Sequence, residues 1–186
     1  MSDNILLLNI KDGVDNKIID TLYEYYLDYE TRKFFTSEMN VVSKKVFIEE
    51  FRKKLTYKYH EFMLIKNLKD DKIIGFIYSF RYKPNDGTLY TTVYISKDYR
   101  NKIYGVKAGL IFYKFLFEKY TIRKIYCCIY SYNDTMINIA EKGGYRLEGK
   151  LLNHKYYNGK YYDMFIYALY KEDFYLMLKK LTKESS

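Results

Sequence analysis

The stretch "YISKDYRNKIYGVKAG" (94–109) joins an apolar, β-branched segment to a segment with helical spacing. We expect the strand to end early in this stretch and a helix to begin near Ile103. The first N–H groups of a helix have no partner within the helix, and their aligned dipoles attract anions. Gly105 lets an anion approach the backbone, and Arg100 and Lys102 add positive charge. The stretch therefore predicts a loop that binds a phosphate or pyrophosphate group.

An ordinary strand-to-helix turn explains the same residues. The stretch contains neither GxxxxGK[ST] nor GxGxxG, because Gly105 and Gly109 are its only glycines. In this second interpretation the glycines serve the packing of the helix on a sheet. Both interpretations stay open on these residues alone.

Outward from this stretch, turn signals and hydrophobic spacing divide the chain into strands and helices. The predicted strands are 5–10, 60–66, 72–82, 88–96, 123–131, 146–157 and 160–170. The predicted helices are 14–30, 43–55, 103–120, 134–142 and 171–180. A helical crossover should make strands 88–96 and 123–131 parallel, and Asn158-Gly159 predicts a two-residue hairpin turn. The order predicts a mixed α/β sheet in one domain, residues 1–186.

The composition is that of a globular protein of 186 residues, with 48% hydrophobic, 30% charged and 20% aromatic residues. A net charge of +9 favours an anionic partner: nucleic acid, an anionic membrane surface or a phosphorylated cofactor. Lysines spread along the chain also fit a merely solubilising surface.

The two cysteines, Cys127 and Cys128, are neighbours on a predicted strand, where they should point to opposite faces of the sheet. We therefore expect no disulfide between them and place both in the strand core. No Cys/His cluster suggests a metal. No apolar run approaches the length of a membrane span, and no signal peptide is recognisable, so we expect a cytoplasmic protein without membrane partners.

Two blocks of this sequence resemble the GNAT superfamily of N-acetyltransferases. In the first, Arg100-Asn101-Lys102-Ile103-Tyr104-Gly105 resembles the acetyl-CoA-binding motif (Arg/Gln)-x-x-Gly-x-(Gly/Ala). In the second, residues 130–174, the family's pattern is matched in order and spacing by Asn133, Gly144-Tyr145, Glu148-Gly149, Asn158-Gly159 and Asp163. The resemblance covers about residues 5–173. The tail is most similar to the branch of ribosomal-protein-alanine N-acetyltransferases.

The resemblance implies a GNAT-like mixed, mostly antiparallel central sheet with a splayed parallel strand pair and flanking helices. It implies acetyl-CoA as the acyl-donor cosubstrate, no metal, and direct transfer of acetyl to a primary amine of a protein N-terminus or a small molecule. Backbone of residues 93–95 would bind pantetheine, residues 100–106 pyrophosphate, and Asn133 the region near the sulfur. The implied donor-binding residues are Val93, Tyr94, Ile95, Arg100, Asn101, Lys102, Ile103, Tyr104, Gly105, Val106 and Asn133.

The sequence departs from the family at three positions. Ile103 replaces the first glycine of the motif, and Ala140 stands where many relatives carry a tyrosine general acid. Tyr90 and Thr92 occupy the strand on which many relatives carry an acidic residue. The general acid and base are therefore unassigned.

Three residues are candidates for the catalytic proton transfers: Glu38, Tyr90 and His154. Each has an ordinary structural interpretation, namely a solvated loop carboxylate, a tyrosine that packs on the sheet and a half-buried packing histidine. The oxyanion formed during acyl transfer needs a donor, and a backbone N–H of Tyr94 or Ile95 is expected to supply it.

Two other functions stay open. The chain could be a catalytically inactive GNAT-fold scaffold or sensor, because the acid and base are unassigned. The positive charge and aromatic strands also fit a nucleic-acid-binding module, but no RNP-type sequence is present and the tyrosines are scattered, so nucleic acid is not the expected partner. Edge strands of the C-terminal hairpin could pair two copies in a homodimer.

Overall fold

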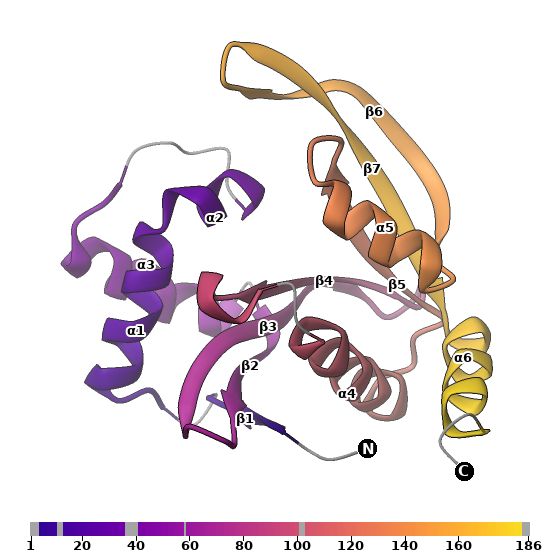
Figure 1. Ribbon diagram of the computed structural model, residues 1–186, viewed down its shortest axis with the longest axis horizontal. Helices are drawn as coiled ribbons and strands as arrows, with labels where there is room; N and C mark the ends of the chain where they lie inside the picture. Colours follow the sequence, from indigo (N-terminus) through magenta and orange to yellow (C-terminus); the bar gives the residue numbers. More distant parts are fainter. Residues whose placement is uncertain (1–3, 11–12, 36–40, 58, 101–102, 184–186) are drawn as a thin grey trace.

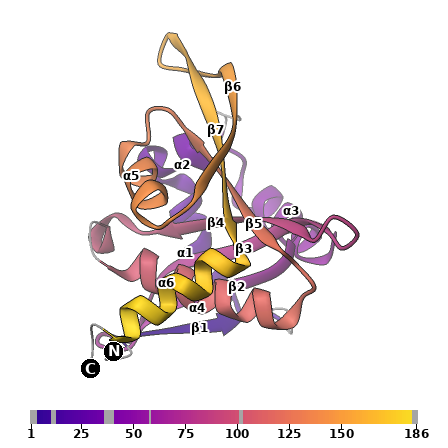
Figure 2. The ribbon, with the colours of Figure 1, turned by 90° about the vertical axis from the view of Figure 1, so that its right-hand side faces the viewer.

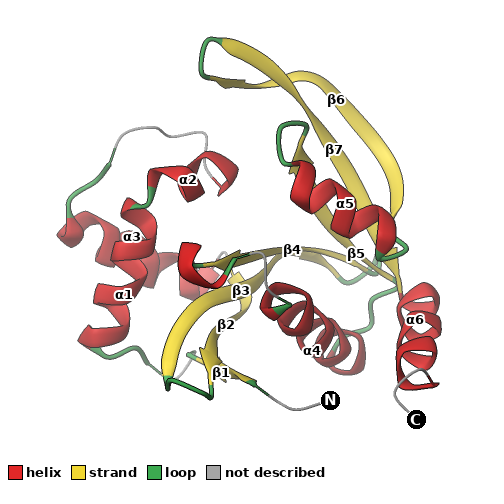
Figure 3. Ribbon diagram, viewed as in Figure 1, coloured by secondary structure: helices red, strands yellow, loops and turns green. Residues whose placement is uncertain are grey.

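The computed structural model describes residues 4–10, 13–35, 41–57, 59–100 and 103–183. These residues form one seven-stranded sheet with helices on both faces (Figures 1 and 3). The strands are β1 (Ile5–Asn9), β2 (Tyr59–Asn67), β3 (Lys72–Lys83), β4 (Thr88–Ile95), β5 (Lys124–Tyr130), β6 (Arg146–Tyr157) and β7 (Lys160–Tyr170). The helices are α1 (Asn16–Leu27), α2 (Tyr29–Phe35), α3 (Lys44–Tyr57), α4 (Tyr104–Lys119), α5 (Asp134–Lys142) and α6 (Lys171–Lys183).

The sheet has the order β1-β2-β3-β4-β5-β7-β6. Every neighbouring pair is antiparallel except β4 and β5, which are parallel and joined through α4. The predicted fold class is thus confirmed, including the parallel pair. A short 3-10 turn, Lys97–Tyr99, lies between β4 and the start of α4.

Alternating side chains along the strands form two hydrophobic layers. On one face, Met63 and Ile65 of β2 belong to a cluster that includes Phe112 of α4. On the other face, Phe62 and Leu64 pack in a cluster with Leu22 of α1 and Phe51 of α3. Helices α4 and α6 therefore cover one face, and α1 and α3 cover the opposite face at the β1–β4 side.

The prediction of one helix over 14–30 is wrong, because the chain forms two helices that meet at Asp28. Asp15 caps α1 by accepting the N–H of Ile18 at 2.7 Å. Asp28 leaves the helical region (φ −65°, ψ 100°), and its carboxylate accepts the N–H of Glu30 at 3.1 Å. Such a side-chain bond competes with the helical backbone bond, ends α1 and starts α2.

The β6–β7 hairpin projects beyond the rest of the sheet (Figure 2). Asn158 (φ 51°) and Gly159 (φ 80°) at its tip both have positive φ. This geometry confirms the predicted two-residue turn, since a type I′ turn requires positive φ at both central positions.

Candidate active site

The parallel strands β4 and β5 pair at three positions only: Thr88 with Lys124, Leu89 with Ile125 and Tyr90 with Tyr126. Beyond Tyr90, no strand of the described residues pairs with the edge of β4 that faces β5. We call this part of β4, residues 91–95, the open edge. The predicted splaying of the parallel pair is thereby confirmed.

Alternation along β4 decides which backbone groups face the open edge. Ser96 donates its N–H to the carbonyl of Ile74 on β3 at 2.8 Å. Since successive strand residues turn their N–H and C=O groups to opposite sides, the backbone of Tyr94 also faces β3, while Val93 and Ile95 face the open edge. Of the two proposed oxyanion donors, the N–H of Ile95 is therefore the one that points into the opening.

The first turn of α4 lies beside the end of the open edge. A Cβ added to Gly105 would lie 3.4 Å from Cγ1 of Ile95. The first backbone hydrogen bond of the helix runs from the N–H of Lys107 to the carbonyl of Ile103 at 3.0 Å. The N–H groups of residues 104–106 precede it and have no acceptor within the helix. The first turn also contains no acidic residue, so its partial positive charge is available to an anion.

Two of the predicted loop residues, Asn101 and Lys102, lie outside the described residues. Ile103, which replaces the motif glycine, is 60% exposed and does not cap α4 with a side-chain hydrogen bond. Its side chain therefore points into solvent at the mouth of the predicted pyrophosphate loop.

Arg100 connects this loop to the N-terminal helices. Its Nε donates to the carbonyl of Ile95 at 3.0 Å, and its Nη2 lies 3.0 Å from Oδ2 of Asp28. The guanidinium also lies over the ring of Tyr94, 5.9 Å from the centroid. Binding of pyrophosphate by Arg100 stays a prediction, and it would compete with the ion pair to Asp28.

Asn133 caps α5, as expected, by accepting the N–H of Met136 at 3.3 Å. Asn133 lies three residues beyond the end of β5 at Tyr130, at the start of α5. Its contact with a donor near the sulfur stays a prediction.

Tyr90 lies in a row of rings on the sheet face opposite α4. Its ring stacks on Tyr126 of β5 at 5.0 Å and lies 5.6 Å from Phe80 of β3. The guanidinium of Arg81 lies 5.7 Å from the centroid of Tyr90. Burial raises the pKa of Tyr90, so near neutral pH its hydroxyl is a proton donor rather than a base.

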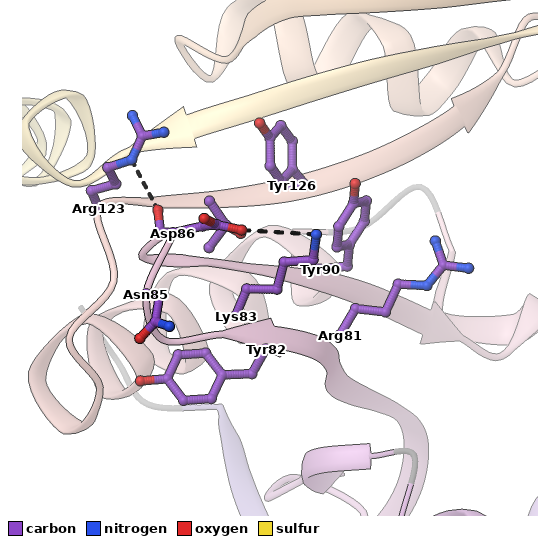
Figure 4. A pocket seen from close by; sticks show the side chains of 9 residues that line it. Arg81, Tyr82, Lys83, Asn85, Asp86, Tyr90, Arg123 and Tyr126 are labelled. Carbon is purple, nitrogen blue, oxygen red and sulfur yellow. Dashed lines mark hydrogen bonds and ion pairs between the residues drawn. The ribbon is translucent and has the colours of Figure 1, made fainter.

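A polar cavity of about 970 Å³ opens beside these rings at the start of β4 and β5 (Figure 4). Lys83 and Arg123 both contact Asp86 at its rim. The cavity is lined by Arg81, Tyr82, Lys83, Asn85, Asp86, Thr88, Tyr90, Arg123 and Tyr126. It lies at the paired end of β4 and β5, opposite the open edge, so Tyr90 borders both regions.

Of the three candidate catalytic residues, the structure describes two, Tyr90 on β4 and His154 on β6. Glu38 lies outside the described residues. His154 lies toward the tip of the projecting hairpin, in a stretch between Leu151 and Lys155 where the register with β7 shifts. It is exposed, so its interpretation as a half-buried packing histidine is wrong.

The prediction that both cysteines are in the core is wrong for one of them. Cys128 is exposed on β5, while Cys127 packs against a cluster that includes Ala140. Burial raises the pKa of the Cys127 thiol to about 12. Neither cysteine forms a disulfide.

Among the residues that the structure describes, no group of three or more His, Cys, Asp or Glu side chains could hold a metal ion. Within the same residues, no helix is both long and apolar enough to cross a membrane.

Sequence reasoning missed an aromatic contact between α2 and the hairpin. The hydroxyl of Tyr132 donates to the carbonyl of Lys33 at 2.5 Å, and its ring lies 5.6 Å from Phe34. On the other side, the ring of Tyr132 packs against Tyr157 at 5.1 Å and Tyr162 at 4.9 Å. The contact was not foreseen because α2 itself was not.

A second missed feature is a charged network below the hairpin. Lys124 of β5, 7% exposed, lies 2.6 Å from Glu148 of β6. The hydroxyls of Tyr126 and Tyr170 donate to the same carboxylate at 2.8 and 2.5 Å. Burial opposes ionisation of Glu148, but the hydrogen bonds from Lys124 and the two tyrosines outweigh it and lower its pKa to about 2.

Known proteins resemble this chain in sequence or in fold. A curated relative, the SPbeta prophage-derived uncharacterized N-acetyltransferase YokL of Bacillus subtilis (strain 168), is 29% identical over 116 residues. That match covers 62% of this chain and 66% of the relative's length.

Three solved structures share the fold at low sequence identity. A spermidine N-acetyltransferase from Vibrio cholerae, in complex with CoA and spermine, has a TM-score of 0.78 at 13% identity, covering 93% of this chain and 99% of that one. An acetyltransferase (GNAT family) from Bacillus anthracis has a TM-score of 0.74 at 19% identity, with 92% and 98% covered. RimL, a ribosomal L7/L12 alpha-N-protein acetyltransferase in complex with CoA, has a TM-score of 0.74 at 15% identity, covering 91% of this chain and 95% of that one.

The family assignment rests on a match to most of the chain. Residues 10–166 match the family model described as the acetyltransferase (GNAT) domain. The matched range includes the open edge of β4, the first turn of α4 and most of the hairpin. The chain therefore belongs to the GNAT acetyltransferase family.

Proposed function

We propose that the protein is an acetyl-CoA-dependent N-acetyltransferase that transfers acetyl directly from the thioester to a primary amine. One observation carries the proposal: the open edge of β4 leads to the uncapped first turn of α4. The open edge offers both backbone groups of Val93 and the N–H of Ile95 to an extended amide chain, as in strand addition, whereas the carbonyl of Ile95 already accepts from Arg100. The α4 N-terminus offers backbone N–H groups to a phosphate. In CoA, pantetheine is an extended amide chain and is followed by a pyrophosphate group. The two groups therefore follow each other in the same order as the open edge and the first turn of α4.

The residues would divide the chemistry as follows. Of the two expected oxyanion donors, Tyr94 and Ile95, only the N–H of Ile95 faces the opening, where it would either bind the amide chain or stabilise the developing oxyanion. The amine must lose a proton, because amines are mostly protonated near neutral pH. Tyr90, with its raised pKa, serves in this proposal to orient the acceptor rather than as the base. Glu38 and His154 stay proposals for the base, to be tested by substitution.

The acceptor class is proposed more broadly than the donor. The structural relatives include a spermidine N-acetyltransferase and an alpha-N-protein acetyltransferase, so a small amine and a protein N-terminus are both supported. The net charge of +9 favours an acceptor that is not a polycation.

Two further proposals concern location and assembly. A donor that cells keep in their interior and two free cysteines support a cytoplasmic location. The exposed edge strand β6 supports the proposed homodimer, which a measurement of mass in solution would test.

Calorimetric titration with acetyl-CoA and with CoA tests the donor site. Gly105→Asp places a negative charge in the first turn of α4, where the added Cβ meets only Ile95 at 3.4 Å. At about 5 Å and an effective dielectric constant of about 20, repulsion by one phosphate charge costs about 3 kcal/mol, or more than 100-fold in affinity.

Ile111→Asp is the matched control. It adds the same charge at a 45% exposed position of the same helix, about 9 Å further along. We expect its affinity to be unchanged. Equal affinities for Gly105→Asp and the unaltered protein would refute the donor site. A folded protein that binds acetyl-CoA but acetylates no amine in a broad panel would instead support the inactive-scaffold alternative.

A further inference from the structure

A β-bulge places a positively charged side chain beside the end of the β4–β5 pairing. The register of β3 with β4 shifts between Phe80 and Lys83, where two residues of β3 lie opposite one residue of β4. Arg81 is one of these two residues and has a φ of 50°, which residues other than glycine seldom adopt. A bulge turns side chains out of the regular alternation of a strand. Here it brings the guanidinium of Arg81 to 5.7 Å from the ring centroid of Tyr90.

Arg81 acts on both strands at the point where they separate. Tyr90 is the last β4 residue that pairs with β5, and its partner there is Tyr126. Cys128 lies two positions beyond Tyr126 and on the same face, because alternate residues of a strand share a face. Desolvation raises the pKa of the Cys128 thiol, and the positive charge of Arg81 opposes that rise. The guanidinium therefore lies near the opening, on the sheet face opposite α4.

The polar cavity beside Tyr90 has an excess of positive charge. Its lining contains three cations, Arg81, Lys83 and Arg123, and one acid, Asp86, so two positive charges remain. The carboxylate of Asp86 lies 3.8 Å from Lys83, and Arg123 donates to the backbone carbonyl of Asp86. Within the parts of the chain that the structure describes, no carboxylate forms an ion pair with either arginine. Figure 4 shows these two arginines on opposite sides of the Tyr90 ring.

The carboxylate of Glu148 does not offset this charge. It accepts the hydroxyl of Tyr126 at 2.8 Å and therefore lies close to the cavity wall. Lys124 lies 2.6 Å from the same carboxylate, so the pair carries no net charge. The cavity therefore attracts anions. A guanidinium binds a carboxylate through two parallel hydrogen bonds, which makes Arg81 a suitable anchor for such a group.

The proposed donor would present its thioester toward this cavity. With pyrophosphate at the first turn of α4 and pantetheine along the open edge, the donor runs from Ile95 back toward Tyr90. The acceptor amine must meet the thioester in the opening. An anionic group elsewhere on the same acceptor then lies within reach of Arg81.

We propose that the cavity binds an anionic group of the acceptor, so that the preferred acceptors are primary amines that also carry a carboxylate. The inference rests on the proposed function and narrows its acceptor class. Arg81 is a specificity-determining residue: it holds the carboxylate while the amine reaches the thioester, and it transfers no proton. A carboxylate is the anionic group that the two supported acceptor classes, small amines and protein N-termini, have in common.

Matched acceptors that differ in one charge test this specificity. A series of ω-amino carboxylates of increasing length is compared with the corresponding amides, to probe small amines. Peptide amides with a glutamate near the N-terminal amine are compared with their glutamine counterparts, to probe protein N-termini. Mass spectrometry of the acetylated products gives kcat/KM for each acceptor. We expect the unaltered protein to prefer the acid about tenfold or more in one of the two series, the usual gain from a hydrogen bond to a charged group.

Substitutions of Arg81 assign the preference to this side chain. Arg81→Gln should reduce the preference for acids to less than about threefold and leave the affinity for acetyl-CoA unchanged, whereas Arg81→Lys keeps the charge and should keep part of the preference. Arg81→Gly also removes the side chain, and glycine adopts a positive φ without strain, so this variant should fold even if the others do not. Arg52→Gln is the matched control: it removes the same charge from an exposed position of α3, outside the cavity, and should keep the full preference.

The outcomes separate this inference from the proposed function. If acetyl-CoA binds but acids and amides react equally, if no acid is acetylated, or if Arg81→Gln and Arg81→Gly keep the full preference, the carboxylate site is overturned while the donor site stands. A loss of acetyl-CoA affinity in folded Arg81→Gln would also overturn it, because the cavity would then serve the donor. If the folded, unaltered protein does not bind acetyl-CoA at all, the proposed function falls and the inference falls with it.

Discussion

Replacing Glu148 by Gln should destabilise the protein by about 2 kcal/mol at neutral pH. The carboxylate of Glu148 lies 2.6 Å from the buried ammonium of Lys124. A pKa lowered from the ordinary 4.5 to about 2 corresponds to about 3 kcal/mol of preference for the charged form in the folded state. The side chain of Glu148 is 24% exposed, and solvent screening reduces this contribution to about 2 kcal/mol. The glutamine keeps the shape and can still accept hydrogen bonds, so the loss reports the charge.

Urea unfolding of both proteins, from about pH 7 to about pH 3, measures this contribution. Because folding lowers the pKa of Glu148, its stabilisation is present above the ordinary pKa and is lost as the pH falls toward the folded value. The difference between Glu148→Gln and the unaltered protein should therefore shrink on acidification. Folding raises the pKa of Lys124, whose stabilisation is present below its ordinary value of 10.5 and so does not change over this range.

Glu172→Gln supplies the control for a generic loss of charge. Its carboxylate is 75% exposed and lies 3.5 Å from Arg146. We expect this variant to lose less than about 0.5 kcal/mol. A loss at Glu148 no larger than at Glu172, or one that is unchanged between pH 7 and pH 3, would refute the argument that the network holds a buried charge pair.

Three further outcomes follow from local geometry. The carboxylate of Asp15 caps α1 by accepting the N–H of Ile18 at 2.7 Å. Asp15→Ala removes this cap and should lower the free energy of unfolding, measured by urea titration, by about 1 kcal/mol. Gly75→Ala would place a Cβ 2.1 Å from the carbonyl oxygen of Tyr94, and we expect a loss of about 3 kcal/mol or more; normal stability would contradict the close approach of β3 to β4. Mass spectrometry after labelling of the native protein with a thiol reagent should find Cys128 modified and Cys127 unmodified, since only Cys128 is exposed; equal labelling would contradict this burial.

Most elements of the fold were predictable because their signals are local. The β-branched runs, the Asn158-Gly159 turn and the cap at Asn133 each specify a conformation within a few residues, and the structure has all three. The break at Asp28 was missed because the apolar spacing of α1 continues past it. Only the geometry of that carboxylate shows that one helix ends and another begins.

The candidate site was predictable only in part. The start of α4 was predicted because glycine and helix-start signals are adjacent in sequence, while the binding role of the residues before it stays a prediction. The contact between Lys33 and Tyr132 and the network around Glu148 join residues that are more than 20 positions apart. Their partners follow from which strands and helices pack together, and the period of a single segment carries no information about that.

The short pairing between β4 and β5 has a mechanical consequence. The sheet consists of two parts, β1–β4 and β5–β7. Within each part, neighbouring strands are paired along most of their length, but the two parts are joined by only the three residue pairs between β4 and β5. A change in the angle between the parts strains few backbone hydrogen bonds beyond that seam. Leu89 and Ile125 pair there and lie, fully buried, in the same hydrophobic cluster as Phe112 and Phe174. The width of the opening is therefore set by the side chains packed beneath the seam more than by the backbone that spans it.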